Sequence, residues 1–206
     1  SEMCIRDRYY HGYETMNENL DLFEKVINKT IPKVDYVDIR GGNGNNTSII
    51  MKDGEVQEIN TGNSLGIRIR VLNNGAWGFA YTNDLSKLDE IAQTSIKISN
   101  SLKGDESLSK ADIIQDKVST DVKIPFSDVS IEEKKEIMSE ASKAASLKEV
   151  TSTTVSYSDS QSQEVILSSE GTSIEMNTNR VAMFLNAAAS DGTTVSYTHL
   201  TLPTKR

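Results

Sequence analysis

Two short reversals of the chain, Asp53-Gly54 and Asn74-Gly75, constrain the fold of this sequence more than any other feature. Each pair accepts positive φ at two successive positions, which is the geometry that reverses a twisted pair of strands within two residues. Between the two reversals, apolar side chains alternate with glycine and arginine. One face of that strand is therefore apolar and the other is charged or bare, so this region is predicted to form hairpin strands of a half-buried sheet.

Three aromatic residues, Trp77, Phe79 and Tyr81, alternate with alanine and glycine after the second reversal. The small residues leave room for another element to approach the sheet closely on their face. The aromatic face also needs a cover, and the helix that begins at Leu85 is the simplest one. Trp77 is therefore predicted to be substantially buried.

Helical spacing of apolar residues predicts amphipathic helices near 19–31, 85–102 and 131–147, the last preceded by a capping box of Ser130 with Glu133. Strand patterns occur at 34–40, 47–52, 150–158, 164–168, 172–176 and 180–189. The sequence therefore predicts an α/β (α+β) chain. We expect a mixed β-sheet with amphipathic helices, followed by a truncated second α+β domain.

The Gly-rich segment GGNGNN at 41–46 is predicted to be a turn between two strands. A phosphate-binding glycine loop would open a helix and offer its first amides to the phosphate, whereas a β-branched stretch follows here. The phosphate interpretation is therefore disfavoured.

The two ends of the chain are predicted to be foreign to the folded domains. Ser1 to Arg8 and Thr194 to Thr204 back-translate to the two arms of a common transposase-type sequencing adapter, in opposite orientations. Peptides encoded by an adapter were never selected against this core, so 1–8 and 195–206 are expected to pack on nothing specific. The predicted organisation is 1–8 adapter-derived, 9–104 an N-terminal α/β domain, 105–127 a polar linker, 128–193 a truncated second domain, and 194–206 adapter-derived.

Charge and residue usage disfavour several classes of function. The chain has 22 basic and 30 acidic residues, a net charge of −8, and no basic cluster, so we expect no nucleic-acid partner. No apolar stretch approaches the ~20 residues of a membrane span, so no membrane partner is expected either. Between the two adapter-like ends there is no cysteine and one histidine, His11, which is too few for a disulfide framework or a site of three or four metal ligands.

Four carboxylates are candidate acid or base groups. Asp35 and Asp38 lie on the first predicted strand, and Glu55 and Glu58 follow the first reversal. Carboxylates in such positions more often lie solvated at the edge of a sheet than act as general acids, and we interpret these four in that way.

Arg68 and Arg70 project from one face of the central strand. Paired guanidinium groups there could hold a ligand carboxylate, although salt bridges to the sheet's own acids are the favoured interpretation. No residue of the chain is predicted to be catalytic, cofactor-binding or metal-binding.

The order of several motifs resembles the N-terminal portion of the TldD/PmbA family, also called the modulator of DNA gyrase family. DYVDIR at 35–40, KDGEV at 52–56, GIRIRV at 66–71 and GAWGFAYT at 75–82 carry the resemblance. It continues in IPFSDVSIEEKKEIM at 124–138, which is similar to the start of the family's second domain, and at 157–181, which is similar to its S-x-G-containing hairpins.

This resemblance implies a cytoplasmic zinc metallopeptidase that degrades small or unfolded peptides or trims peptide precursors. It also implies a homo- or heterodimer that encloses the active site. The family's zinc site is built around a HExxxH helix, and no HExxxH occurs in this sequence. We therefore expect this chain to provide scaffold and chamber wall, with no zinc or catalysis of its own. A non-catalytic family member or a protein-interaction module is the alternative.

Overall fold

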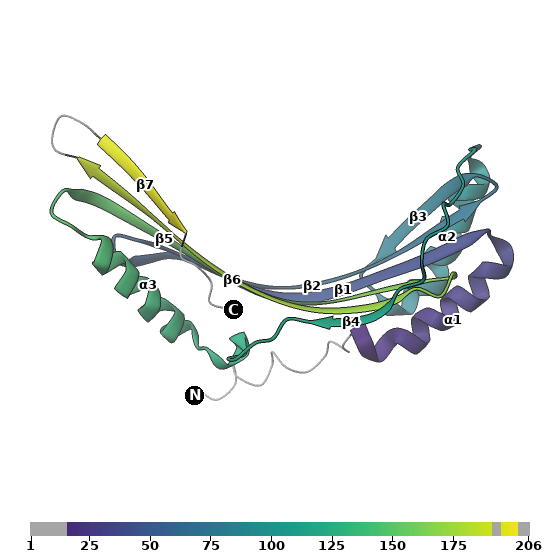
Figure 1. The fold of residues 1–206 in the computed structure, drawn as a ribbon, viewed down its shortest axis with the longest axis horizontal. Coiled ribbons are helices and arrows are strands. Elements are labelled where there is room, and N and C mark those ends of the chain that lie inside the picture. The colour runs from purple at the N-terminus through teal and green to yellow at the C-terminus, as the bar shows by residue number, and fades with distance from the viewer. Residues whose placement is uncertain (1–15, 191–194, 202–206) are drawn as a thin grey trace. The chain divides into compact units, whose positions relative to one another are not determined.

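The computed structural model describes residues 16–190 and 195–201, and Figure 1 shows the order of its elements. The helices are α1 (Leu20–Thr30), α2 (Leu88–Ser101) and α3 (Ile131–Ala145). The strands are β1 (Tyr36–Lys52), β2 (Glu55–Asn73), β3 (Ala76–Thr82), β4 (Gln115–Ser119), β5 (Val150–Ser168), β6 (Ser173–Ser190) and β7 (Val195–Thr201). The three predicted helices and both predicted hairpin turns are confirmed.

The strands form one sheet in the order β3-β2-β1-β5-β6-β4, and β7 also pairs with β6. β2 and β3 are antiparallel, as are β6 and β7. β4 runs parallel to β6, because the Ser173 N–H donates to the Ile114 carbonyl and the Thr120 N–H donates to the Asn177 carbonyl, each at 2.9 Å. The sheet is therefore mixed, and the predicted α+β class is confirmed.

The chain divides into two compact units that are not contiguous in sequence. The first contains Ser1–Asn43, Leu65–Val118 and Gln163–Met176, and the second contains Gly44–Ser64, Ser119–Ser162 and Asn177–Arg206. This division differs from the domains predicted at 9–104 and 128–193. The physical reason is that β1, β2, β5 and β6 are long strands, each of which contributes one part to either unit.

The core of the first unit lies between one face of the sheet and the helices α1 and α2. Phe23 of α1, Ile91 of α2 and Ile69 of β2 belong to a single buried cluster that also includes Val37 and Val165. Because side chains alternate between the faces of a strand, both helices cover the face that carries the apolar residues of β2. The alternation predicted between the two reversals is confirmed.

Helix α2 packs directly on the small residues of β3. A Cβ placed on Gly78 would overlap the backbone oxygen of Ser95 and lie 2.7 Å from the Ser99 nitrogen. The predicted close approach is confirmed, but the prediction that α2 also covers the aromatic face is wrong. The helix lies on the opposite face from Trp77, which is only half-buried, while Phe79 remains 47% exposed.

The glycines at 41–46 lie inside β1, so the predicted turn there is wrong. Among the described residues, the glycines with positive φ are Gly54, Gly75 and Gly171, and none belongs to this segment. Instead, a Cβ on Gly41 would lie 2.9 Å from Sδ of Met16. Glycine is used here to let neighbouring groups approach the strand rather than to reverse the chain.

The core of the second unit lies beneath α3. Met138 of this helix packs with Ile49 and Met51 of β1, Val155 of β5 and Leu185 of β6. No helix within the described ranges is long and apolar enough to cross a membrane.

The expectation that 195–206 pack on nothing specific is wrong for Val195–Thr201, which form β7 and pair with the 184–190 part of β6. A strand ladder joins backbone groups, so an open strand edge can pair with a segment whose side chains were not selected for it. Residues 1–8 and 202–206 lie outside the described residues, and the adapter origin of both ends stays a prediction.

Candidate functional site

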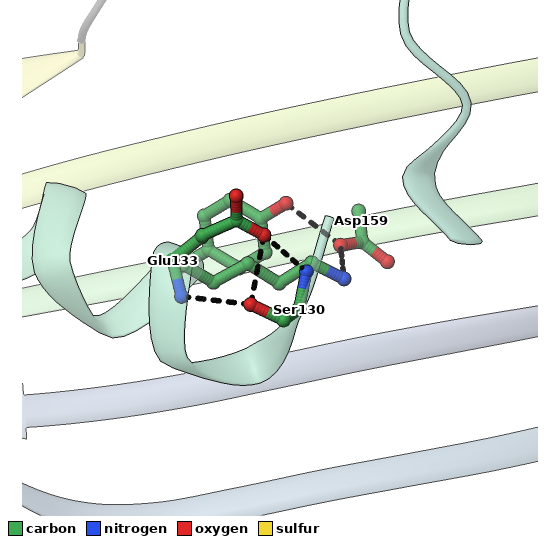
Figure 2. Close-up of polar contacts among 5 residues, drawn as sticks. Ser130, Glu133 and Asp159 are labelled. Carbon is green, nitrogen blue, oxygen red and sulfur yellow. Dashed lines mark hydrogen bonds and ion pairs between the residues drawn. The ribbon is translucent and has the colours of Figure 1, made fainter. Parts of the chain in front are cut away.

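Helix α3 begins with a reciprocal capping box, which Figure 2 shows at the centre of a polar group. The Ser130 hydroxyl accepts the Glu133 N–H at 3.2 Å, and the Glu133 carboxylate accepts the Ser130 N–H at 2.8 Å and its hydroxyl at 2.7 Å. These hydrogen bonds from Ser130 lower the pKa of Glu133. The predicted capping box is confirmed, and it fixes the start of α3 at Ile131, three residues before Lys134.

Lys134 of α3 forms a buried cluster with Asp159 and Tyr157 of β5. Its Nζ lies 2.6 Å from Oδ2 of Asp159, and the side chains of both residues are 5% exposed. The Tyr157 hydroxyl donates to the same oxygen at 2.7 Å (Figure 2). Burial of the phenol, followed by its hydrogen bond to Asp159, raises the pKa of Tyr157 above its ordinary value.

The sequence contained a signal for this Lys134 cluster, which was missed in the sequence interpretation. Lys134 lies four residues before Met138, on the apolar side of α3, where a solvated lysine would not be placed. Tyr157 and Asp159 follow Val155 at alternate positions, so they share its inward face of β5. The ion pair joins Lys134 of α3 to Asp159 of β5, so it holds the helix against this strand while the two buried charges neutralise each other.

A second polar cluster lies on the face of the first unit that is opposite to α1 and α2. The Asp38 side chain is 2% exposed, and its Oδ2 accepts from Nε of Arg70 at 2.8 Å and lies 2.7 Å from a terminal nitrogen of the same guanidinium. This ion pair confirms that Arg70 pairs with an acid of its own sheet. The interpretation of Asp38 as a solvated carboxylate at the sheet edge is wrong, because its side chain is buried. Arg70 supplies the counter-charge that makes this burial possible.

Aromatic rings complete this second cluster. The Arg70 guanidinium lies 4.4 Å from the centroid of the Trp77 ring, a cation–π contact. Tyr36 meets Trp77 edge-on, with ring centroids 6.0 Å apart and an interplanar angle of 84°. Partial burial of Tyr36, followed by the charge of Asp38, raises the pKa of this tyrosine.

The other candidate carboxylates lie at the surface, as interpreted from the sequence. Asp35, Glu55 and Glu58 are exposed. Asp35 has a local structural role, since its Oδ2 accepts the Asn74 N–H at 2.8 Å and so supports the turn between β2 and β3. His11 lies outside the described residues.

Neither buried carboxylate fits a metal ion. Asp38 is paired with Arg70 and Asp159 with Lys134, so a cationic side chain already occupies the position that a metal would take. Within the part of the chain that the structure describes, no three histidine, cysteine, aspartate or glutamate residues gather in a group that could hold a metal. The zinc implied by the resemblance therefore has no ligand set among these residues.

Two family models match consecutive parts of this chain. Residues 37–99 match the PmbA/TldA metallopeptidase domain 1, and residues 124–202 match the PmbA/TldA metallopeptidase central domain. The chain belongs to the PmbA/TldD family. Its sheet, with helices on the two units, is thus the N-terminal and central part of a PmbA/TldD fold.

Relatives of this PmbA/TldD chain carry the name Metalloprotease. One from Methanothermobacter thermautotrophicus is 45% identical over 184 residues, which is 89% of this chain and 40% of the relative. One from Methanocaldococcus jannaschii is 35% identical over 185 residues, which is 87% of this chain and 40% of the relative. The chain therefore spans about 40% of the length of the curated relatives it matches.

Solved structures share the fold at low sequence identity. A putative modulator of DNA gyrase from Bacteroides thetaiotaomicron has a TM-score of 0.74 at 17% identity, covering 89% of this chain and 44% of the other. TldE from Thermococcus kodakarensis has a TM-score of 0.66 at 16% identity, covering 86% of this chain and 42% of the other. These likenesses concern the fold.

Proposed function

We propose that this chain is the N-terminal portion of a PmbA/TldD zinc metallopeptidase that acts on small or unfolded peptides. In this proposal the portion described here is scaffold, and it forms part of the wall of a chamber in a homo- or heterodimer. The observation that carries the proposal is the match to domain 1 and the central domain in order, together with 45% identity to a relative named Metalloprotease. Most of that relative's length lies outside the match, where a zinc-binding helix can reside.

The internal pairing of the buried charges supports a scaffold role. Asp38 and Asp159 are each held by a cation of the same unit, so neither is free to act as a general base. Such buried pairs keep the sheet and α3 in place without offering a reactive group to a substrate.

The proposal is tested by extending the reading frame beyond Gly192 and searching for HExxxH. We expect the motif to be present and the purified full-length protein to contain about one zinc per protomer, as a catalytic site of three protein ligands would hold. It should hydrolyse an unfolded peptide, lose that activity on treatment with 1,10-phenanthroline, and regain it with zinc. Light scattering should give the mass of a dimer.

A reading frame without HExxxH would contradict the peptidase proposal. It would favour the alternative of a non-catalytic family member or interaction module. The specific observation in favour of this alternative is the exposure of Phe79 and Tyr81, 47% and 76%, on the edge strand β3. A full-length protein that carries the motif and is inactive on every unfolded peptide tested would point the same way.

A further inference from the structure

We propose that the first unit binds an extended acidic peptide segment on one face of β2 and β3. This surface, called here the arginine-aromatic face, consists of Arg68, Arg70, Trp77, Phe79 and Tyr81. The inference concerns binding alone and does not depend on whether the full-length protein hydrolyses peptides.

Strand register places these side chains together. Arg68 lies directly opposite Tyr81 and Arg70 directly opposite Phe79, and residues opposite one another in an antiparallel pair project to the same face. Helices α1 and α2 cover the other face, so within the described residues neither helix covers the arginine-aromatic face. The Phe79 and Tyr81 rings are stacked, with centroids 6.2 Å apart, and both are largely exposed.

The two arginines differ in the ion-pair and hydrogen-bond partners that they already have. Arg70 is held by Asp38 and lies over the Trp77 ring. Arg68 has a buried Nε without a hydrogen-bond partner among the described residues, although its side chain as a whole is partly exposed. The buried Nε itself is closed to solvent, but Arg68 forms no ion pair among the described residues. A carboxylate is the acceptor whose geometry best matches a guanidinium, so a ligand carboxylate at the exposed part of this side chain would supply the counter-charge that Arg68 lacks.

The position of β3 selects an extended ligand. β3 is the terminal strand of the sheet order and pairs with β2 alone, so its outer edge presents backbone groups that a further strand can join (Figure 1). A peptide added there projects every second side chain onto the arginine-aromatic face. Gly66 lies next along this face, and a Cβ placed on it would meet no atom within 4 Å, so there is room beside Arg68.

Charge complementarity distinguishes an acidic peptide from a neutral one. The chain carries a net charge of −8, so it repels acidic ligands over most of its surface, and a cationic face is the place where one can bind. Aromatic rings beside arginine also form the residue combination that most often dominates binding energy at interfaces. We therefore assign the acidic peptide, rather than a second copy of this chain, as the occupant.

The binding test uses a labelled, end-blocked heptapeptide in which glutamate alternates with valine, and a matched peptide with glutamine in place of glutamate. Fluorescence anisotropy gives the two affinities, and emission from Trp77, the single tryptophan of the chain, reports binding at the arginine-aromatic face without a label. We expect the glutamate peptide to bind about tenfold more tightly, the difference of one charge-assisted hydrogen bond. The preference should decrease as salt is added.

Three variants locate the binding surface. Arg68→Gln should reduce the preference for glutamate over glutamine to about one, and Tyr81→Ser should weaken both peptides about tenfold, the loss expected for an aromatic anchor. Arg180→Gln removes an exposed arginine from the second unit and is the matched control, which should change neither affinity. Circular dichroism and melting of each variant confirm that it is folded.

Equal affinity for the two peptides, or an unchanged preference in Arg68→Gln, would overturn the proposal. It would also be overturned if light scattering found a dimer without peptide that Tyr81→Ser dissociates, because the occupant would then be a second copy of the chain.

Discussion

The ion pair of Lys134 with Asp159 and the pair of Lys29 with Asp89 have similar distances, 2.6 and 2.9 Å, but opposite environments. The side chains of the first pair are 5% exposed, whereas those of the second are 64% exposed. Burial changes the consequence of removing one partner, because an uncompensated charge cannot reach water. The two pairs therefore make a matched test of what burial contributes.

We predict that Asp159→Asn destabilises the protein by about 3–5 kcal/mol, because it leaves the Lys134 ammonium buried without a counter-charge. Lys29→Gln, which breaks the exposed pair, should cost about 0–1 kcal/mol. Urea unfolding of both variants measures the difference. Equal losses would show that Lys134 reaches solvent and that the buried pair does not hold α3.

Tyr157 makes stability depend on pH from the ordinary titration range of tyrosine upward. Its pKa is raised in the folded protein by burial and by Asp159, so the folded state retains the phenol proton after the unfolded state has lost it. The resulting stability is fully present below about pH 10, the unfolded value, and is lost as the pH rises above it. Tyr157→Phe should make the decline of the unfolding free energy between about pH 9 and 11 shallower.

The control for this pH measurement is Tyr81→Phe, since Tyr81 is 76% exposed. This variant should keep the decline of the parent protein. A Tyr157→Phe protein with the same pH dependence as the parent would argue against a raised Tyr157 pKa.

At the scale of elements, glycine has two uses in this sheet. Gly54 and Gly75 have φ of 83° and 74° and reverse the chain at the two predicted turns. Gly78 has no such conformation, and its role is to let α2 approach β3. The helix also fixes itself to the sheet through Ser95, whose Oγ donates to the Ile69 carbonyl at 3.0 Å. The second use depends on which face the helix covers.

We predict that Gly78→Ala destabilises the protein by at least about 1–3 kcal/mol, because the new methyl group would overlap the backbone of α2. Gly66→Ala is the control on the open face of β2, where no atom lies within 4 Å of the added Cβ. It should be neutral or stabilise by about 0.4–1 kcal/mol by reducing the entropy of the unfolded chain. Thermal melting compares the two, and a Gly78→Ala protein that melts with the parent would place α2 elsewhere.

At the scale of the whole molecule, each unit has its own apolar core, and the four long strands contribute to both. The unit boundaries fall at 43–44, 64–65, 118–119, 162–163 and 176–177. Four of them lie inside the long strands β1, β2, β5 and β6, in stretches rich in glycine, asparagine, serine and glutamine. Such residues bury little apolar surface, so neither core extends through these positions. The polar segment 105–127, which the sequence predicts as the linker, contains one of the five boundaries, at 118–119. The other four lie in shorter polar stretches inside strands, which a search for linkers does not find.

We predict that the chain of residues 9–193 does not bind zinc with sub-micromolar affinity. Its buried carboxylates are paired with cations, and a stable site needs at least three ligands. Calorimetric titration with zinc measures this directly, with the full-length protein as the positive control. Stoichiometric tight binding by residues 9–193 would contradict the assignment of the metal site to the rest of the protein.

The sequence by itself determined the features that depend on neighbouring residues. The two turns, the capping box of α3, the spacing of the amphipathic helices and the alternation along β2 all follow from local backbone preferences and side-chain period. The motif order of domain 1 and the central domain was likewise readable without a structure.

Tertiary structure alone decided the features that depend on residues far apart in the chain. Whether Asp38 is solvated depends on Arg70, 32 residues away, and whether Lys134 is buried depends on Asp159. The same holds for the face of β3 that α2 covers and for the continuity of β1 through its glycines. Residue type sets what a side chain or backbone can tolerate, but the partner that approaches it sets which of those possibilities is used.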